Sequence, residues 1–354
     1  MQNPFSTTFS KFPEYSYIST NEPREMIDNF SYDSPSESVY KITGIRGSGK
    51  TVIMASVQEE LKSEDNARKG WLVYTLNPTR DMLHQFAAYL YSEKFIKESI
   101  KSKSISISAS ILGTGGGIGY SAQKDEKYFD IGVEIRKMLD VVKKKKKKIL
   151  ICVDEVSKTN DMVIFALEFG GWLISGYPVY IVCTGLYENV IELGNTKNLT
   201  FFRRGTSIET KPLNHVKMSE MYRTLLGVDV DISKRMASIT NGYAYAFQQL
   251  GALYFKKGKK ESFDGIVNEL KSELFSYSYE KIWEELTDED RFLASLLTEK
   301  EEYKRAEVIE LMGEKSGNYS MYRDRLLKRG VILARQGYIG LNPPFFAEYI
   351  CDYG

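Results

Sequence analysis

One stretch near the N-terminal end limits the possible folds of this chain more than any other. Residues 44–51 fit the pattern G-x-x-x-x-G-K-[ST]. Glycines let backbone N–H groups curl around a phosphate, while a lysine ammonium serves the outer phosphates and a threonine hydroxyl serves a metal ion. We therefore expect one phosphate-binding loop, made of Gly44, Ile45, Arg46, Gly47, Ser48, Gly49, Lys50 and Thr51.

The sequence on both sides of this loop supports the same interpretation. Residues 39–43 are rich in β-branched and aromatic side chains and predict a strand, and residues 52–61 predict a helix. Phosphate would then lie at a helix N-terminus, where the helix dipole favours an anion. Strand, loop and helix in this order predict a site for a nucleoside triphosphate, with Mg²⁺ held by Thr51.

Composition sets wider bounds on the fold and on the partners of the chain. A length of 354 residues suggests two or three domains, and a net charge of +1 leaves no overall field that attracts nucleic acid or a membrane. No apolar run approaches the roughly 20 residues that span a bilayer. We see no secretory signal and no metal-ligand spacing among three cysteines, so the simplest expectation is a cytoplasmic protein away from the membrane.

The first 210 or so residues alternate between strand-like and helix-like stretches. Such alternation predicts a parallel α/β sheet. The five strands are expected at residues 39–43, 70–76, 149–153, 179–184 and 206–209, and residues 77–79 are expected to cap a long helix after the second.

Acidic and polar side chains follow two of these strands. Asp154 and Glu155 end the apolar run that begins at Ile149, and Thr184 ends the next strand. Ligands of open α/β sheets bind at this edge of the sheet. We expect Asp154 to bind Mg²⁺ with Thr51, and Glu155 to act as the base that polarises the attacking water. Thr184 either orients that water and senses the γ-phosphate, or only caps the turn at Gly185.

Two further segments allow two interpretations each. Residues 103–123 predict a glycine-rich β-hairpin, which is either an arm that contacts DNA or a neighbouring subunit, or a solvent-exposed hairpin. The run Lys143–Lys148 is either a nucleic-acid patch or the solvated end of a helix. Its place between a helix and a strand favours the solvated end, since cations suit a helix C-terminus.

The strands stop after residue 213, and helical periodicity takes over. Three apolar stripes at helical spacing predict a small helical domain. From Thr287 the pattern predicts three helices and then a hairpin that turns at residues 335–337, which together form a winged helix-turn-helix. The second of these helices is expected to carry Ala306, Ile309 and Leu311, and the third to face inward with Tyr322 and Leu326.

These motifs together resemble the AAA+/STAND class of P-loop ATPases, in particular those with an origin-recognition-type layout. The resemblance implies an ATPase core over residues 1–212, a helical lid over 213–280 and a C-terminal winged helix over 281–354. It implies ATP/ADP and Mg²⁺ as ligands, hydrolysis of ATP, and a sensor role for Thr184. It also places Arg203 and Arg204 near an arginine finger that acts in trans within a homo-oligomer. The lid stretch 240–251 contains no arginine, which is more similar to STAND lids and implies slow hydrolysis.

The predicted third C-terminal helix exposes short polar and basic side chains, as a recognition helix in the major groove requires. DNA is therefore the expected partner, contacted by Ser320, Arg323, Arg325, Lys328 and, from the wing tip, Arg335. Two alternatives remain: a STAND-type signalling switch whose winged helix contacts proteins, and an ATPase associated with mobile elements or transposition.

Overall fold

The computed structural model describes residues 2–8, 12–63, 70–100 and 130–354. The predicted hairpin at residues 103–123 lies outside these residues. The chain forms two compact units, which we describe separately. One comprises Met1–Arg24, Thr43–Ser56 and Ile208–Gly354, and the other comprises Glu25–Ile42 and Val57–Ser207.

A five-stranded sheet confirms the predicted α/β fold. Its strands run in the order β2-β3-β4-β1-β5, and β2, β3 and β4 pair in parallel, with Val73 opposite Leu150 and Ile151 opposite Ile181. Every residue of β1 and β4 is buried, so β4 reads as a nearly continuous apolar run rather than an alternating one, whereas β1 also buries the side chain of Lys41. The strands are β1 (Val39–Thr43), β2 (Trp71–Leu76), β3 (Lys148–Val153), β4 (Val179–Gly185) and β5 (Thr206–Glu209).

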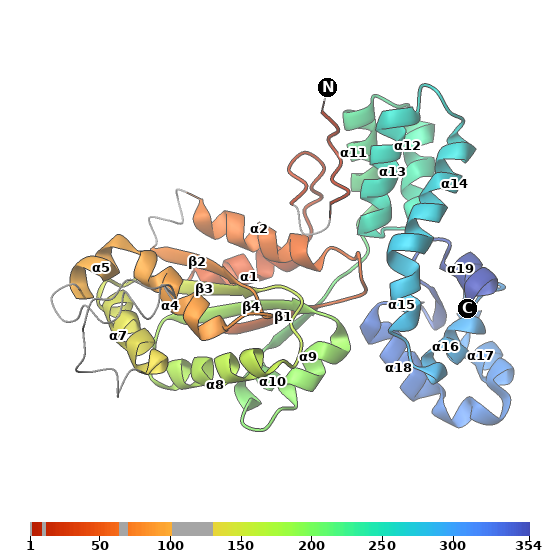
Figure 1. The fold of residues 1–354 in the computed structure, drawn as a ribbon. Coiled ribbons are helices and arrows are strands. Elements are labelled where there is room, and N and C mark those ends of the chain that lie inside the picture. The colour runs from red at the N-terminus through yellow and green to blue at the C-terminus, as the bar shows by residue number, and fades with distance from the viewer. Residues whose placement is uncertain (1, 9–11, 64–69, 101–129) are drawn as a thin grey trace, which may run out of the picture. The chain divides into compact units, whose positions relative to one another are not determined.

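Helices cover both faces of this sheet (Figure 1). One face is packed by α4 (Met82–Ser92), α7 (Ile131–Lys144) and α8 (Asn160–Ile174), whose buried side chains share one core with the strands. On the other face α1 (Glu22–Ser31) places Phe30 against the rings of Tyr40, Trp71 and Tyr180. The lysine run begins in the last turn of α7 and ends at the first residue of β3.

One predicted helix start was wrong. Helix α4 begins at Met82, and its N-cap is Asp81, whose carboxylate accepts a hydrogen bond from the backbone N–H of His84 at 3.0 Å. Asn77 does not cap the helix, because its side chain accepts from the N–H of Thr79 at 2.9 Å and holds residues 77–79 in a turn.

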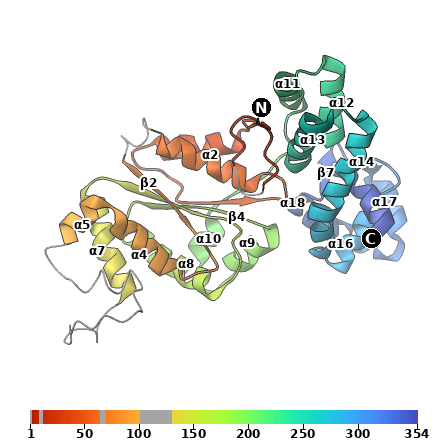
Figure 2. The same ribbon diagram turned by 45° about the horizontal axis from the view of Figure 1, so that its top comes forward.

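The helical lid consists of α11 (His215–Leu226), α12 (Val230–Thr240), α13 (Ala244–Lys257) and α14 (Phe263–Leu274), of which α11, α12 and α13 lie side by side (Figure 2). Helix α14 continues through a π-helical segment, Phe275–Tyr279, into α15 (Glu280–Glu284). Such π-helical turns occur frequently at functional sites.

The C-terminal part has the winged-helix arrangement. Thr287 caps α16, as predicted, by accepting from the N–H of Asp290 at 3.3 Å, and the wing turns at Gln336 and Gly337, whose φ values are 49° and 88°. Tyr322 and Leu326 of α18 are buried as expected. Helix α17 carries Ala306, Ile309 and Leu311 as expected, but it buries Val308 and Met312 and leaves Ala306 and Leu311 exposed. The elements are α16 (Asp288–Ser295), β6 (Tyr303–Lys304), α17 (Arg305–Met312), α18 (Tyr319–Arg329), β7 (Ile332–Arg335), β8 (Tyr338–Leu341) and α19 (Phe346–Tyr353).

None of the helices in the described ranges combines the length and the apolar composition that a membrane span requires.

Candidate functional site

The predicted phosphate loop connects β1 to helix α2 (Lys50–Lys62). The chain turns within the loop, where the N–H of Ser48 donates to the carbonyl of Ile45 at 3.2 Å, and the helix starts where the N–H of Ile53 donates to Gly49 at 3.0 Å. Gly47 and Gly49 have φ values of 75° and 95°, which residues with a Cβ rarely adopt. Lys50 reaches back over the loop, and its Nζ donates to the carbonyls of Gly44 and Ile45 at 2.9 and 3.0 Å.

Backbone and side-chain groups of the lid contact this loop. The N–H of Tyr245 donates to the carbonyl of Gly47 at 3.0 Å, and a Cβ on Gly47 would lie 2.4 Å from the hydroxyl of Tyr243. On the other side, Thr210 donates its hydroxyl to Ser48 at 2.9 Å. The curled backbone, the helix N-terminus and the ammonium of Lys50 fit a bound phosphate, so the predicted residues of the loop suit the nucleotide.

Arg46 points from the loop towards the helix that leads into the winged helix. Its Nη2 lies 3.1 Å from Oε1 of Glu285, the residue that follows α15. Its Nε is buried and finds no acceptor among the residues that the structure describes. A buried donor without an acceptor is uncommon and calls for a partner such as a phosphate oxygen.

The acidic residues form an arrangement of their own in the second unit. The hydroxyl of Thr184 donates to the carboxylate of Asp154 and accepts from the N–H of Glu155 at 3.1 Å. The backbone carbonyl of Thr184 also accepts from the N–H of Val156 at 2.8 Å. Glu155 has a φ of 54°, and strained residues of this kind cluster at active sites. Thr184 is fully buried and therefore fixes the turn that presents both acids.

Both predicted finger residues lie on α10 (Thr200–Arg204), and their side chains are exposed. Beneath them the buried Lys41 donates from Nζ to the carbonyls of Phe202 and Arg203, at 2.9 and 3.0 Å. Burial lowers the pKa of this ammonium from its usual value. Lys41 thus holds the end of α10 that carries Arg203 and Arg204.

The predicted DNA-contacting side chains of α18 differ in their freedom. Arg325 is engaged internally, since its Nη2 lies 2.7 Å from Oδ1 of Asp290, which is fully buried. Lys328 pairs with Asp324 at 2.7 Å. Arg323 is half-buried, and Ser320 on α18 and Arg335 at the wing tip are exposed.

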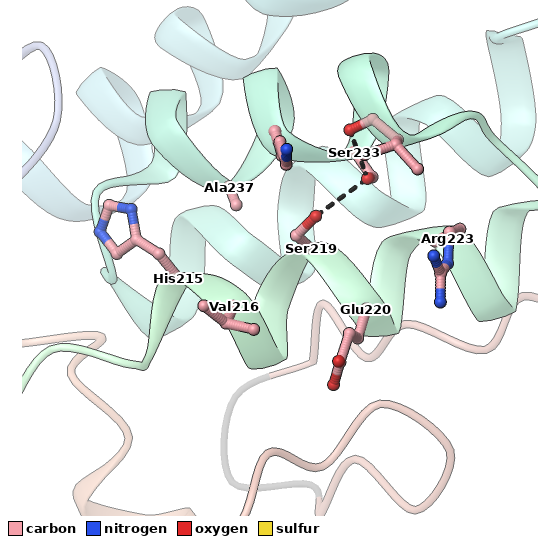
Figure 3. A pocket seen from close by; sticks show the side chains of 9 residues that line it. His215, Val216, Ser219, Glu220, Arg223, Ser233 and Ala237 are labelled. Atoms are coloured by element: carbon pink, nitrogen blue, oxygen red, sulfur yellow. Dashed lines mark hydrogen bonds between the residues drawn. The ribbon is translucent and has the colours of Figure 1, made fainter.

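A groove of about 390 Å³ lies between α11 and α12 (Figure 3). The hydroxyls of Ser219 and Ser233 meet across its floor at 2.9 Å, so their hydrogen bond closes the groove at that point. Val216 and Val230 leave 66% and 44% of their surface exposed at its sides. No predicted site residue lies in this groove.

Several residues of the site were not predicted from the sequence: Thr210, Tyr243, Tyr245, Glu285 and Lys41. Only Lys41 carried a signal, because a lysine in the middle of an apolar strand must find buried acceptors. The others act through contacts with residues distant in the sequence, and the types of residue alone do not indicate them.

Comparisons with known protein families and curated sequences give one match. A family model described as a domain of unknown function (DUF8462) matches residues 276–350, which begin in the π-helical segment and include the winged helix. The comparison with curated protein sequences finds no match.

Similar solved structures exist over almost the whole chain. The Walker-type ATPase of Pyrococcus abyssi has a TM-score of 0.59 and 12% identity, over 94% of this chain and 96% of that chain. The ORC2 protein of Aeropyrum pernix, solved in ADPNP–ADP complexes, has a TM-score of 0.59 and 10% identity, over 98% and 96%. These likenesses confirm the fold: a P-loop α/β core, a helical lid and a C-terminal winged helix in an origin-recognition-type layout.

Proposed function

We propose that this chain is an ATP-binding and ATP-hydrolysing switch that binds DNA through its winged helix, with the nucleotide controlling DNA engagement. The observation that carries the proposal is the phosphate loop, in which Gly47 and Gly49 have left-handed backbone conformations. The lid contacts this loop through the backbone N–H of Tyr245, which donates to the carbonyl of Gly47. The similarity to the ORC2 protein, whose structure contains ADPNP and ADP, supports a nucleotide as the ligand.

The roles of the residues follow from their chemistry. Backbone N–H groups of residues 44–51 and the Lys50 ammonium hold the phosphates, and the Thr51 hydroxyl and the Asp154 carboxylate hold Mg²⁺, which neutralises phosphate charge when bound. Glu155 accepts a proton from the attacking water. Thr184 is a positioning residue, because it donates to Asp154 and fixes the backbone of Glu155. Arg203 and Arg204 act on the nucleotide of a neighbouring copy.

Nucleotide binding and hydrolysis are tested first. Lys50→Ala should abolish binding of a fluorescent ADP analogue, and Glu155→Gln should retain ATP while turnover falls by at least about 100-fold. A Glu155→Gln variant with wild-type turnover would remove Glu155 as the base. The matched control is Glu188→Gln, since Glu188 is another acid that follows β4 in the same unit.

DNA binding is tested by salt dependence. Arg323→Ala should weaken binding to duplex DNA and reduce the slope of log K against log salt by about 0.9, since each phosphate contact releases counterions. Arg235→Ala is the control, because it also removes a positive charge but lies on α12, paired with Asp264 at 2.8 Å. The measurement is made with ATP, with ADP and without nucleotide. Equal binding by both variants and the wild type would place the DNA contact elsewhere.

A second function is favoured by a specific observation. Three cations of α18 are already engaged within the protein: Arg325 and Arg329 with Asp290, and Lys328 with Asp324. This favours a signalling switch whose winged helix braces the protein or contacts another protein. The lid stretch without arginine supports slow hydrolysis in such a switch. Protein purified with bound ADP and without DNA affinity in any nucleotide state would favour this second function.

A further inference from the structure

Arg46 connects the phosphate loop to the segment that leads into the winged helix. Its guanidinium and the carboxylate of Glu285 are 3.1 Å apart, with 35% and 33% of the two side chains exposed. An ion pair at this level of exposure is weak, and either charge can exchange its partner readily.

Glu285 is also bonded to the recognition helix, through its backbone. Its carbonyl accepts from Nη1 of Arg329 at 3.0 Å, and Arg329 belongs to α18. The Arg329 side chain is only 10% exposed and lies 3.3 Å from the buried carboxylate of Asp290, to which Arg325 is also paired. A displacement of Glu285 therefore reaches α18 through one hydrogen bond and one shared carboxylate.

The backbone of Arg46 is fixed by a hydrogen bond, whereas its guanidinium can bind either Glu285 or another acceptor. The Tyr243 hydroxyl donates to the carbonyl of Arg46 at 2.6 Å and meets the hydroxyl of Ser278, in the π-helical segment, at 2.7 Å. The Arg46 Nε, buried and without an acceptor in the described part of the chain, can still donate. Gly330, which ends α18, is close as well, since a Cβ there would lie 3.4 Å from the N of Ile45.

We propose that the Arg46–Glu285 ion pair couples occupancy of the phosphate loop to the winged helix. This inference rests on the proposed function, because it assigns a regulatory contact to the same nucleotide site. A phosphate in the loop carries more charge than a carboxylate and attracts the guanidinium away from Glu285. The Glu285 side chain is then released, which lets its backbone shift and weakens the hydrogen bond that Arg329 donates to its carbonyl. Phosphate and Glu285 compete for Arg46, and the coupling is reciprocal.

The test is a double-mutant cycle on nucleotide affinity in the full chain. Affinity for a fluorescent ADP analogue is measured in the wild type, Glu285→Gln, Arg46→Gln and the double variant. Glu285→Gln should tighten binding by about fivefold, the low end of typical couplings, because the competitor is lost. In the Arg46→Gln background the same change should have almost no effect. Equal tightening in both backgrounds, or none in either, overturns the proposal.

Glu284→Gln is the matched control for the removed negative charge. Glu284 is the neighbouring acid, and its carboxylate pairs with Lys281 at 2.7 Å instead of with the loop. We expect its nucleotide affinity to stay within twofold of the wild type. Tightening equal to that of Glu285→Gln would mean that general charge, and not the ion pair, acts on the nucleotide.

A second measurement separates this inference from the proposed function. Hydrogen exchange of the α18 amides should accelerate when the wild type is saturated with nucleotide, and Glu285→Gln should exchange fast with or without nucleotide. If the wild type binds nucleotide but no DNA, the proposed function fails while the cycle still decides the inference. If DNA affinity depends on nucleotide but the cycle is additive, the function stands and the inference fails. A wild type that binds no nucleotide overturns both.

Discussion

Gly47 is the residue at which the phosphate loop has least freedom. Its φ of 75° lies in the left-handed region, and a Cβ would come within 2.4 Å of the Tyr243 hydroxyl and 2.9 Å of the Tyr245 Cβ. A side chain at position 47 would therefore suffer both backbone strain and collision with the two tyrosines. A glycine is therefore required at this position for two reasons: the loop must curl around a phosphate, and Tyr243 and Tyr245 leave no space for a Cβ.

We predict that Gly47→Ala destabilises the protein by about 1–3 kcal/mol and lowers nucleotide affinity by at least about tenfold. The reason is that the loop must move away from the tyrosines or change its φ. Urea unfolding and titration with the ADP analogue measure the two effects. The control is Gly337→Ala at the wing tip, where φ is 88° but no atom lies within 4 Å of the Cβ. A nucleotide affinity equal to that of Gly337→Ala would show that the collision is harmless.

Lys41 is a second position where one side chain decides local structure. Its ammonium is 4% exposed and bonded to two carbonyls of α10, and burial lowers its pKa. Each charge-assisted hydrogen bond contributes more than a neutral one. The two bonds therefore offset the cost of burying the charge.

Lys41→Met should lower the free energy of unfolding by about 2 kcal/mol, because the buried carbonyl of Phe202 and the partly buried carbonyl of Arg203 lose their donor. It should also loosen the end of α10 and lower any ATPase stimulation that depends on Arg203 or Arg204. Denaturation with urea and turnover at high protein concentration measure these effects. Lys217→Met serves as control, since Lys217 donates to the carbonyl of Ser19 at 2.8 Å from an exposed position. Equal losses in both variants would contradict a special role for Lys41.

At the scale of elements, α16 and α18 are joined by charge as well as by apolar packing. Arg325 and Arg329 of α18 both approach Asp290 in the first turn of α16, and Asp290 is fully buried. A buried carboxylate without a partner is strongly destabilising. Without Arg325 the carboxylate of Asp290 would keep only Arg329, at 3.3 Å, so we expect Arg325 to stabilise the packing of the two helices.

Arg325→Ala should destabilise the winged helix by about 3 kcal/mol, since Asp290 loses its shorter ion pair. Arg323→Ala, two residues earlier on the same helix, should leave stability within about 0.5 kcal/mol of the wild type. Thermal unfolding of both variants measures the difference. The prediction fails if the two variants unfold at the same temperature, and Arg325 would then be available to DNA after all.

The elements that the sequence predicted are ones with a local signal. The five strands were expected from short stretches rich in β-branched, aromatic or apolar residues, and the start of α16 because Thr287 precedes three acids. The turn of the wing was also expected at residues 335–337, from the sequence of the turn itself. The start of α4 was missed because Asn77 and Asp81 are both good caps, and only the turn at Thr79 decides between them.

The site was predictable only as far as its motifs are contiguous. Residues 44–51 and the pair Asp154–Glu155 were predicted as site residues from the pattern alone. The partner of Arg46 is 239 residues away in the sequence. No periodicity reports this pairing, because it depends on how the elements of one unit pack. Thr184, 30 residues after Asp154, was expected at the same edge because the two residues lie at the ends of neighbouring parallel strands. Tyr243 was not distinguishable from the other aromatic residues of the lid.

For the whole molecule, buried tyrosines make stability depend on pH in the alkaline range. Tyr222, Tyr243 and Tyr279 are buried, and burial raises the pKa of all three phenols above the usual value of tyrosine. In the unfolded chain a tyrosine ionises near pH 10. The unfolded state therefore loses these protons first, so the stability they contribute is complete below about pH 10 and is lost as the pH rises further. Lys41 changes stability with pH in the opposite direction, since burial lowers its pKa.

We predict that the free energy of unfolding falls above about pH 10 by roughly 1.4 kcal/mol per pH unit for each buried tyrosine. Burial also raises the pKa of Tyr40, Tyr74 and Tyr245, so the tyrosines outweigh Lys41 and decide the sign of the slope. Urea unfolding at pH 9, 10 and 11 measures the slope, and tyrosinate absorbance should rise in step with unfolding. Tyr222→Phe removes one ionising group and the hydrogen bond to the Phe247 carbonyl at 2.8 Å. This variant should be less stable than the wild type at pH 8. Above pH 10, however, its free energy of unfolding should fall less steeply with pH, by the contribution of one tyrosine. An unchanged slope would mean that Tyr222 ionises without unfolding, and that the lid opens to hydroxide while the rest of the chain stays folded.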